Sequence, residues 1–159
     1  MKNSWTWKAS AGTGIWTPCG RTDSAAGTKV LIADTSAWVE FLRGTGSFPA
    51  HRLRQAISAG QVIVIDPILM EVMAGARRDA VARTQRLLEA QHLEALSAKL
   101  DWLDAASIYR ELRWRGVVVR SQIDALIAAA AIRLDVPILH HDRDFGHIAR
   151  YTPLRTVVS

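Results

Sequence analysis

Cysteine is almost absent from this sequence of 159 residues: Cys19 is the only one, so the chain cannot form an internal disulfide. That usage is typical of the reducing cytoplasm, which is the location we expect for the protein. No run approaches the roughly 20 apolar residues that cross a bilayer, and residues 1–16 lack the apolar stretch of a secretory signal. We therefore expect neither secretion nor a membrane partner.

Glycine-rich phosphate-binding motifs are also lacking. Neither G-x-G-x-x-G nor G-x-x-x-x-G-K-[ST] follows an expected strand, because Gly12 and Gly14 lie in the N-terminal segment. The D-T-S sequence at 34–36 lacks the second aspartate of phosphatases that use an aspartyl nucleophile. Cys19 lies outside the expected domain, and no Ser/His/Asp order indicates a protein nucleophile. These absences weigh against a nucleotide-binding protein, a phosphatase and covalent catalysis.

Positive charge is in excess. The chain has 20 Lys and Arg against 15 Asp and Glu, a formal net charge of +5 and a pI of about 10.0. This balance favours a polyanionic partner such as nucleic acid, because neutralising phosphates releases counterions. The proportions of hydrophobic residues (49%) and charged residues (22%) are those of a folded globular protein, and the length fits one domain.

Residues 1–28 differ in composition from residues 29–159. They are rich in Gly, Ser, Thr and Ala and show no sustained period of 2 or 3.6. We expect an atypical, poorly ordered N-terminal tail followed by one domain over 29–159. Two alternatives stay open: that Trp5, Trp7 and Trp16 dock on the domain, and that the native chain begins near Val30.

Short apolar runs alternate with amphipathic segments after residue 29, which predicts an α/β fold. Such strands, buried on both sides, indicate a central, mainly parallel sheet of 4–5 strands with helices on both faces. The expected strands cover 30–33, 61–65, 93–96, 137–140 and 154–158. The expected helices cover 35–43, 49–58, 67–76, 79–91, 98–114, 121–134 and 145–150.

Four acidic residues stand at strand ends or helix starts: Asp34, Glu71, Asp124 and Asp142. Each has an ordinary explanation. Asp34 suits a helix N-cap, Asp142 a turn, and Asp124 an S-x-x-D box that begins at Ser121, while Glu71 suits a solvated helix face. Functional groups of α/β sheets gather at the carboxyl ends of strands, near the point where the strand order reverses. The four acids together therefore predict a common site at one edge of the sheet.

Carboxylates that are close together repel one another unless a cation compensates their charge. Hard oxygen ligands favour Mg²⁺, with Mn²⁺ as the other candidate. Such a cation activates water, polarises a phosphodiester and stabilises the leaving oxygen. The sequence therefore predicts a metal site that cleaves phosphodiester bonds.

Four segments resemble successive motifs of PIN-domain proteins, above all the VapC toxins of bacterial toxin–antitoxin pairs: VLIADTSAWVEFLRG, PILMEVMAGAR, SQIDALIAAAAIRLDVPILHHDRDF and IARYTPLRTV. The resemblance covers about residues 29–158. It implies a PIN-like three-layer α/β/α fold and a Mg²⁺- or Mn²⁺-dependent endoribonuclease. It also implies a homodimer and inhibition by a small VapB-type antitoxin.

By position, the resemblance implies that Asp34, Glu71, Asp124 and Asp142 are the family's acidic quartet. Asp144 matches the second acid of D-x-D-F and is expected as an outer-shell ligand, and Ser36 matches a hydroxyl residue that supports the metal or a phosphate. His140 departs from the family, which usually carries Thr or Ser there. Either His140 fills the strand end, or it or His141 ligates a softer metal such as Zn²⁺.

Arginines surround the loop before Asp124. Arg113, Arg115 and Arg120 are the candidates for binding RNA phosphates, and Trp114 is a candidate for stacking on a base. The alternative is a solvated helical face with Trp114 in the core or a dimer interface. Our hypothesis for the chemistry is in-line hydrolysis of RNA by metal-activated water. The competing hypothesis is a non-catalytic nucleic-acid-binding domain of the same fold.

Overall fold

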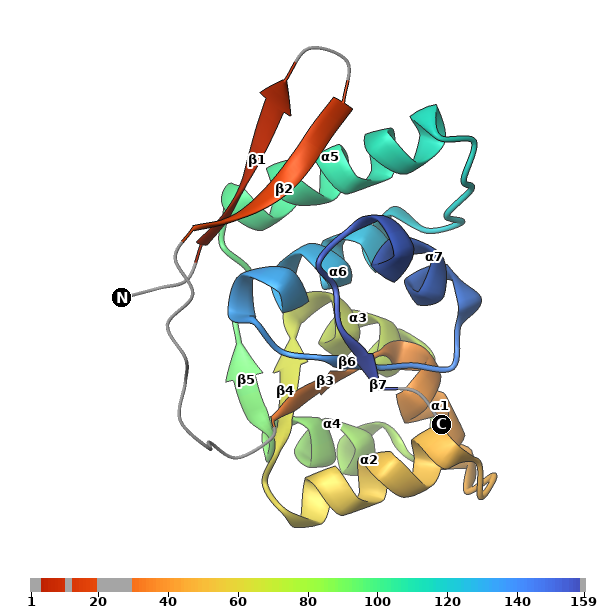
Figure 1. Ribbon diagram of the computed structural model, residues 1–159. Helices are drawn as coiled ribbons and strands as arrows, with labels where there is room; N and C mark the ends of the chain where they lie inside the picture. The colour runs from red at the N-terminus through yellow and green to blue at the C-terminus, as the bar shows by residue number, and fades with distance from the viewer. Residues whose placement is uncertain (1–3, 11–12, 20–29, 158–159) are drawn as a thin grey trace.

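The computed structural model describes residues 4–10, 13–19 and 30–157, and the domain over 30–157 is built around one parallel sheet (Figure 1). Its five strands run in the order β5-β4-β3-β6-β7, and every neighbouring pair is parallel. Their bounds are β3 (Leu31–Ala33), β4 (Val62–Ile65), β5 (His92–Glu94), β6 (Ile138–Leu139) and β7 (Thr156–Val157). The α/β class and the parallel sheet predicted from the sequence are confirmed.

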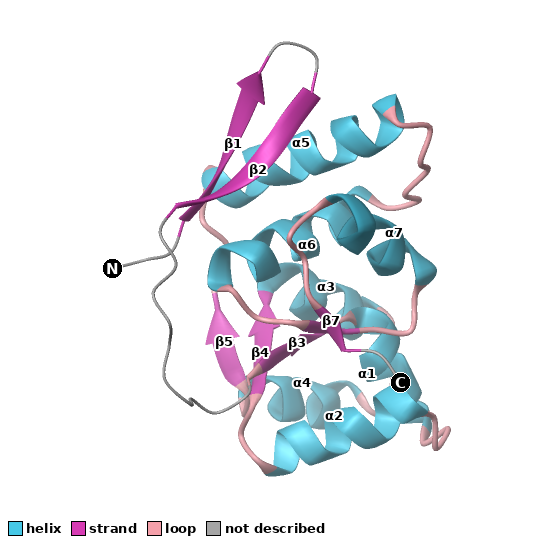
Figure 2. Cartoon of the chain, viewed as in Figure 1, coloured by secondary structure: helices cyan, strands magenta, loops and turns pink. Residues whose placement is uncertain are grey.

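Seven helices connect the strands and form the outer layers. They are α1 (Thr35–Arg43), α2 (Phe48–Ser58), α3 (Asp66–Ala74), α4 (Val81–Glu89), α5 (Leu100–Trp114), α6 (Gln122–Leu134) and α7 (Arg143–Tyr151). Helices α2 and α4 lie on one side of the sheet, and α6 and α7 lie on the other, with α5 outside α6 (Figure 2). Each predicted element of the domain is present, with bounds within two residues of the predicted ones at nearly every end.

The core explains why these segments fold as they do. Strand β4 is buried along its whole length, as expected of an apolar run covered on both faces. Helix α6 carries four consecutive buried alanines (128–131), whose small side chains let the helix pack closely against its neighbours. Trp38 and Phe145 are fully buried and anchor α1 and α7 against this core.

The strand order reverses beside β3. The chain passes from β3 outward through β4 to β5, then returns to place β6 on the other side of β3. Ala33 at the end of β3 pairs with Leu139 at the end of β6. Asp34 and the loop at 140–142 therefore leave the sheet side by side, at the position where open α/β sheets form their sites.

The N-terminal segment contains regular structure that the sequence did not predict. Strands β1 (Ser4–Ser10) and β2 (Thr13–Cys19) form an antiparallel pair that is separate from the main sheet. Trp, Thr and Ile in these two stretches have high strand propensity, and the poor order expected of residues 1–28 stays a prediction. The docking of tryptophan side chains concerns atoms outside the described part of the structure. None of the described helices is long and apolar enough to cross a membrane.

A buried ion pair joins α5 to α6. Asp101 is fully buried and accepts hydrogen bonds from Arg133 Nε (2.7 Å), Arg133 Nη2 (3.0 Å) and the Ser97 N–H (2.7 Å). The Arg133 side chain is four-fifths buried, and it also lies 3.7 Å from Glu94 at the end of β5. This ion pair fixes the start of α5 against the end of α6.

We predict that Asp101→Ala lowers the free energy of unfolding by about 3–5 kcal/mol, because it leaves the Arg133 charge buried without its partner. Urea denaturation measures the change. The control is Asp79→Ala, which removes the exposed pair with Arg77 and should cost less than about 1 kcal/mol. Equal losses for the two variants would contradict the role given to Asp101.

Candidate metal centre

Asp34 lies at the centre of the candidate site, directly after β3. Its carboxylate caps α1, because Oδ2 accepts from the backbone N–H of Ser36 at 2.9 Å and from the Ser36 hydroxyl at 2.6 Å. The residue is only 4% exposed. Burial raises the pKa of Asp34 above its ordinary value, and the hydrogen bonds from Ser36 oppose that shift.

The Ser36 hydroxyl joins two sides of the site. It donates to Asp34 and accepts from the backbone N–H of His141 at 2.8 Å, which fastens the loop after β6 to the start of α1. The contacts of Ser36 orient Asp34. That Ser36 also supports a metal or a phosphate stays a prediction.

Glu71 approaches from α3 and is held by Thr35. The Thr35 hydroxyl donates to Glu71 Oε2 at 2.6 Å. Thr35 was not among the residues predicted for the site. The one signal for Thr35 in the sequence is its place in D-T-S, directly after Asp34. Its contact with Glu71, 36 residues away, leaves no periodic pattern in the sequence.

Asp124 is the carboxylate whose pKa responds to the charges of the other predicted acids. It is in the first turn of α6, after the N-cap Ser121, whose hydroxyl oxygen accepts from the Ile123 N–H at 3.1 Å. Burial, followed by the negative charges of Asp34, Asp142, Asp144 and Glu71, raises the pKa of Asp124 to about 7. All the predicted acids therefore lie within electrostatic range of this one carboxylate.

Asp142 and Asp144 are held by an arginine. Asp142 caps α7 by accepting from the Asp144 N–H at 3.0 Å. Arg120 Nη2 donates to Asp142 Oδ1 and Oδ2 at 2.7 and 2.9 Å. The nearly fully buried Asp144 accepts from Arg120 Nε at 3.1 Å and from the Arg120 backbone N–H at 3.0 Å. These hydrogen bonds help to keep the pKa of Asp144 below its ordinary value, although burial acts against them.

The family follows from comparison with known proteins. The PIN domain family matches residues 31–151. Ribonuclease VapC11 of Mycobacterium tuberculosis is 42% identical over 129 residues, which cover 79% of this chain and 96% of that protein. The chain belongs to the PIN-domain family. VapC11 places it beside the VapC ribonucleases within that family.

Solved structures share the same fold. VapBC2 from Rickettsia felis, in complex with promoter DNA, has a TM-score of 0.64 at 16% identity, covering 80% of this chain and 97% of that one. DNA-bound VapBC from Salmonella typhimurium has a TM-score of 0.62 at 16% identity, covering 82% and 98%. The predicted PIN fold is confirmed.

The donor set of this PIN domain fits a hard divalent cation. Arg120 is the arginine that forms ion pairs with these acids in the described residues, and it pairs with two of the five. Every donor is oxygen, as Mg²⁺ and Mn²⁺ prefer. Within residues 4–10, 13–19 and 30–157, no three His, Cys, Asp or Glu side chains form a ready ligand set. Individual carboxylates instead bind Ser36, Thr35 and Arg120, and a bound cation would have to replace some of these contacts.

His140 stands where the resemblance to the family leads us to expect Thr or Ser. Its two ring nitrogens are buried and find no hydrogen-bond partner among the described residues, and its ring lies 5.3 Å from that of Phe145. Burial lowers the pKa of His140, while the charges of Asp34 and Asp142 oppose that shift. His140 follows β6 directly, and these contacts do not decide between a packing role and a softer metal such as Zn²⁺.

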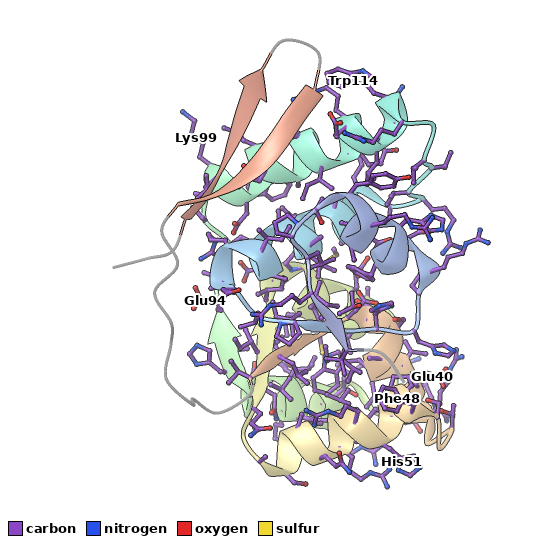
Figure 3. All side chains as sticks on the ribbon, in the orientation of Figure 1. Glu40, Phe48, His51, Glu94, Lys99 and Trp114 are labelled. Atoms are coloured by element: carbon purple, nitrogen blue, oxygen red, sulfur yellow. The ribbon has the colours of Figure 1, made fainter. Side chains whose placement is uncertain are left out.

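The arginines of the 110–120 cluster differ in their contacts. Arg115 pairs with Glu111 at 2.7 Å and lies over the Tyr151 ring, and Arg120 binds the acids. Arg113 forms no ion pair within the described residues. Trp114 is 72% exposed at the outer end of α5 (Figure 3), with Arg110 over its ring. Trp114 is therefore not a core residue in this chain.

We predict that the Asp124 carboxyl group lowers the stability of the metal-free protein as the pH rises from about 4 to 7. The folded protein keeps the Asp124 proton up to a pKa of about 7, whereas the unfolded chain releases it near 3.8. The folded state therefore binds more protons in this window, and the free energy of unfolding falls as the pH increases.

Asp124→Asn should remove this part of the pH dependence. At pH 8 we expect the free energy of unfolding of the variant to exceed that of the wild type by about 1–2 kcal/mol. The difference is no larger because solvent screens a partly exposed carboxylate. Near pH 4 the two proteins should be equally stable. Urea denaturation in EDTA across this range measures the difference. A difference between the two proteins that does not change with pH would contradict the shifted pKa.

Proposed function

We propose that this chain is the toxin of a VapBC-type toxin–antitoxin module and a divalent-cation-dependent endoribonuclease. Membership of the PIN family and 42% identity to a VapC ribonuclease support the activity. The observation that carries the proposal is that hydrogen bonds bring the acidic segments together: Ser36 joins Asp34 to the loop before Asp142, and Thr35 joins Glu71 to the same turn. The negative charges of the other acids also raise the pKa of Asp124. Such a concentration of negative charge lowers stability unless it binds a cation.

In this proposal Asp34, Glu71, Asp124 and Asp142 hold Mg²⁺, or alternatively Mn²⁺, and Asp144 acts from the outer shell. When bound, the cation activates water and stabilises the negative charge that develops on the phosphodiester. The hydroxyl groups next to the acids hold them in place: Ser36 orients Asp34, and Thr35 orients Glu71. Cleavage breaks the bond between phosphorus and the 3′-oxygen and leaves a 5′-phosphate and a 3′-hydroxyl.

The basic residues beside the site bind the RNA backbone in this proposal. Arg113 is exposed and lacks an acidic partner in the described part of the chain, so it is available to a phosphate. Arg115 is the weaker candidate, because Glu111 and Tyr151 already hold its side chain. Sequencing of RNA ends after induction would identify the RNA that is cleaved.

Two protein partners belong to the proposal, a VapB-type antitoxin and a second copy of the chain. The antitoxin is supported by family membership and by two VapBC complexes with this fold. The homodimer is supported by exposed apolar side chains on α5: Leu100 (44%), Trp102 (55%) and Leu103 (55%). Apolar groups at such exposure are typical of protein interfaces. We place this activity in the cytoplasm, which contains the RNA substrate.

We predict that Asp34→Asn and Asp124→Asn each reduce RNA cleavage at least 100-fold while the protein remains folded. Asn keeps the shape of the side chain and removes the charge that holds the cation. Cleavage of a labelled RNA measures the effect, and circular dichroism verifies folding. Asp79→Asn, an exposed substitution outside the site, should cleave at the wild-type rate. Wild-type cleavage by either site variant would refute the assignment.

Removal of divalent cations should abolish cleavage by the wild type, and Mg²⁺ or Mn²⁺ should restore it. Calorimetry should show that Mn²⁺ binds the wild type and binds Asp124→Asn at least 10-fold more weakly, because one oxygen ligand has lost its charge. Failure of the wild type to bind Mn²⁺ would favour the competing hypothesis of a non-catalytic nucleic-acid-binding domain.

A further inference from the structure

Arg120 binds two neighbouring acids with different parts of its side chain. Nη2 spans both oxygens of Asp142, at 2.7 and 2.9 Å. Nε and the backbone N–H both donate to Asp144 Oδ2, at 3.1 and 3.0 Å. The outer end of the guanidinium is thus on Asp142, while its inner end and the backbone are on Asp144.

The two acids differ in exposure. The Asp144 side chain is 1% exposed, whereas those of Asp142 and Arg120 are 32% and 57% exposed. The contact with Asp144 is therefore a fixed anchor, and the contact with Asp142 is open to solvent. If the guanidinium left Asp142, the backbone N–H of Arg120 would still hold Asp144, and Nε lies on the same Asp144 oxygen.

Asp142 is also one of the proposed metal ligands. An arginine that covers both oxygens of a carboxylate occupies the lone pairs that a cation needs, and the positive charges of arginine and cation repel one another. Arg120 and a divalent cation therefore compete for Asp142.

We propose that Arg120 moves between Asp142 and an RNA phosphate, and that cation binding drives this movement. The inference rests on the proposed function. Displaced from Asp142, the guanidinium keeps its anchor on Asp144 and presents its outer N–H groups to the RNA beside the site. Arg120 thereby couples the two ligands: cation binding raises RNA affinity through Arg120, and RNA raises cation affinity by the same factor.

The first test measures Mn²⁺ affinity without RNA. Arg120→Gln removes the competing charge, so we expect Mn²⁺ to bind at least 5-fold more tightly than to the wild type in calorimetry. Arg113→Gln, which removes one charge from the same basic cluster, should leave Mn²⁺ affinity within 2-fold of wild type. If Arg120→Gln does not fold, Arg120→Lys replaces it, because lysine cannot cover both Asp142 oxygens while remaining on Asp144. An unchanged or weakened Mn²⁺ affinity would overturn the proposal, since Arg120 would then merely orient Asp142.

The second test measures binding of a fluorescent RNA oligonucleotide in EDTA and in Ca²⁺, with the probe verified as intact by gel. Arg120→Gln should lower RNA affinity at least 5-fold in Ca²⁺ and less than 2-fold in EDTA. Arg113→Gln should lower it by similar factors in both. If Arg120→Gln lost equal RNA affinity in the two buffers, the proposed movement of Arg120 between Asp142 and RNA would be overturned.

Failure of this inference differs from failure of the proposed function. A wild type that binds Mn²⁺ and cleaves RNA, with Arg120→Gln unchanged in both tests, would overturn the exchange alone. A wild type that neither binds Mn²⁺ nor cleaves RNA would overturn both.

Discussion

Repulsion between carboxylates at the carboxyl end of β3 is the constraint on which the rest of the site depends. The fold places Asp34 in the interior and brings Asp34, Asp142, Asp144 and Glu71 within electrostatic reach of Asp124. Each carboxylate raises the free energy of its neighbours, and within the described residues one arginine, Arg120, pairs with two of them. The buried strands and the alanine-rich α6 supply the packing that holds these charges together, so the domain carries a local instability that a divalent cation would relieve.

Helix starts explain how the chain tolerates so much negative charge. Asp34 caps α1, Asp142 caps α7, and Asp124 lies in the first turn of α6. The backbone N–H groups at a helix start carry partial positive charge, which stabilises an adjacent carboxylate. The ordinary explanation of each acid as a capping residue and its proposed role as a ligand are therefore compatible. The same position serves both, since the capping hydrogen bonds hold the carboxylate still. At Asp142 the Arg120 guanidinium also lies on both oxygens, so a cation would have to displace it.

Local patterns allowed most of the domain to be predicted from its sequence. Apolar runs such as 61–65 and the spacing in 35–43 give strands and helices because burial repeats with a fixed period. Two kinds of feature escaped prediction. The hairpin β1–β2 has strand-forming residues but too short an alternation to stand out. The contacts of Thr35 with Glu71 and of Arg120 with Asp142 join residues 36 and 22 positions apart, and no periodic pattern encodes such side-chain pairs.

Anomalous diffraction from crystals soaked in Mn²⁺ would test the convergence of the acids most directly, because it locates the cation without reference to activity. The account predicts a strong peak between Asp34, Asp124 and Asp142, with the Arg120 guanidinium moved away from Asp142. The absence of a peak at saturating Mn²⁺, or a peak bound only by surface acids such as Asp79 or Glu89, would contradict the account.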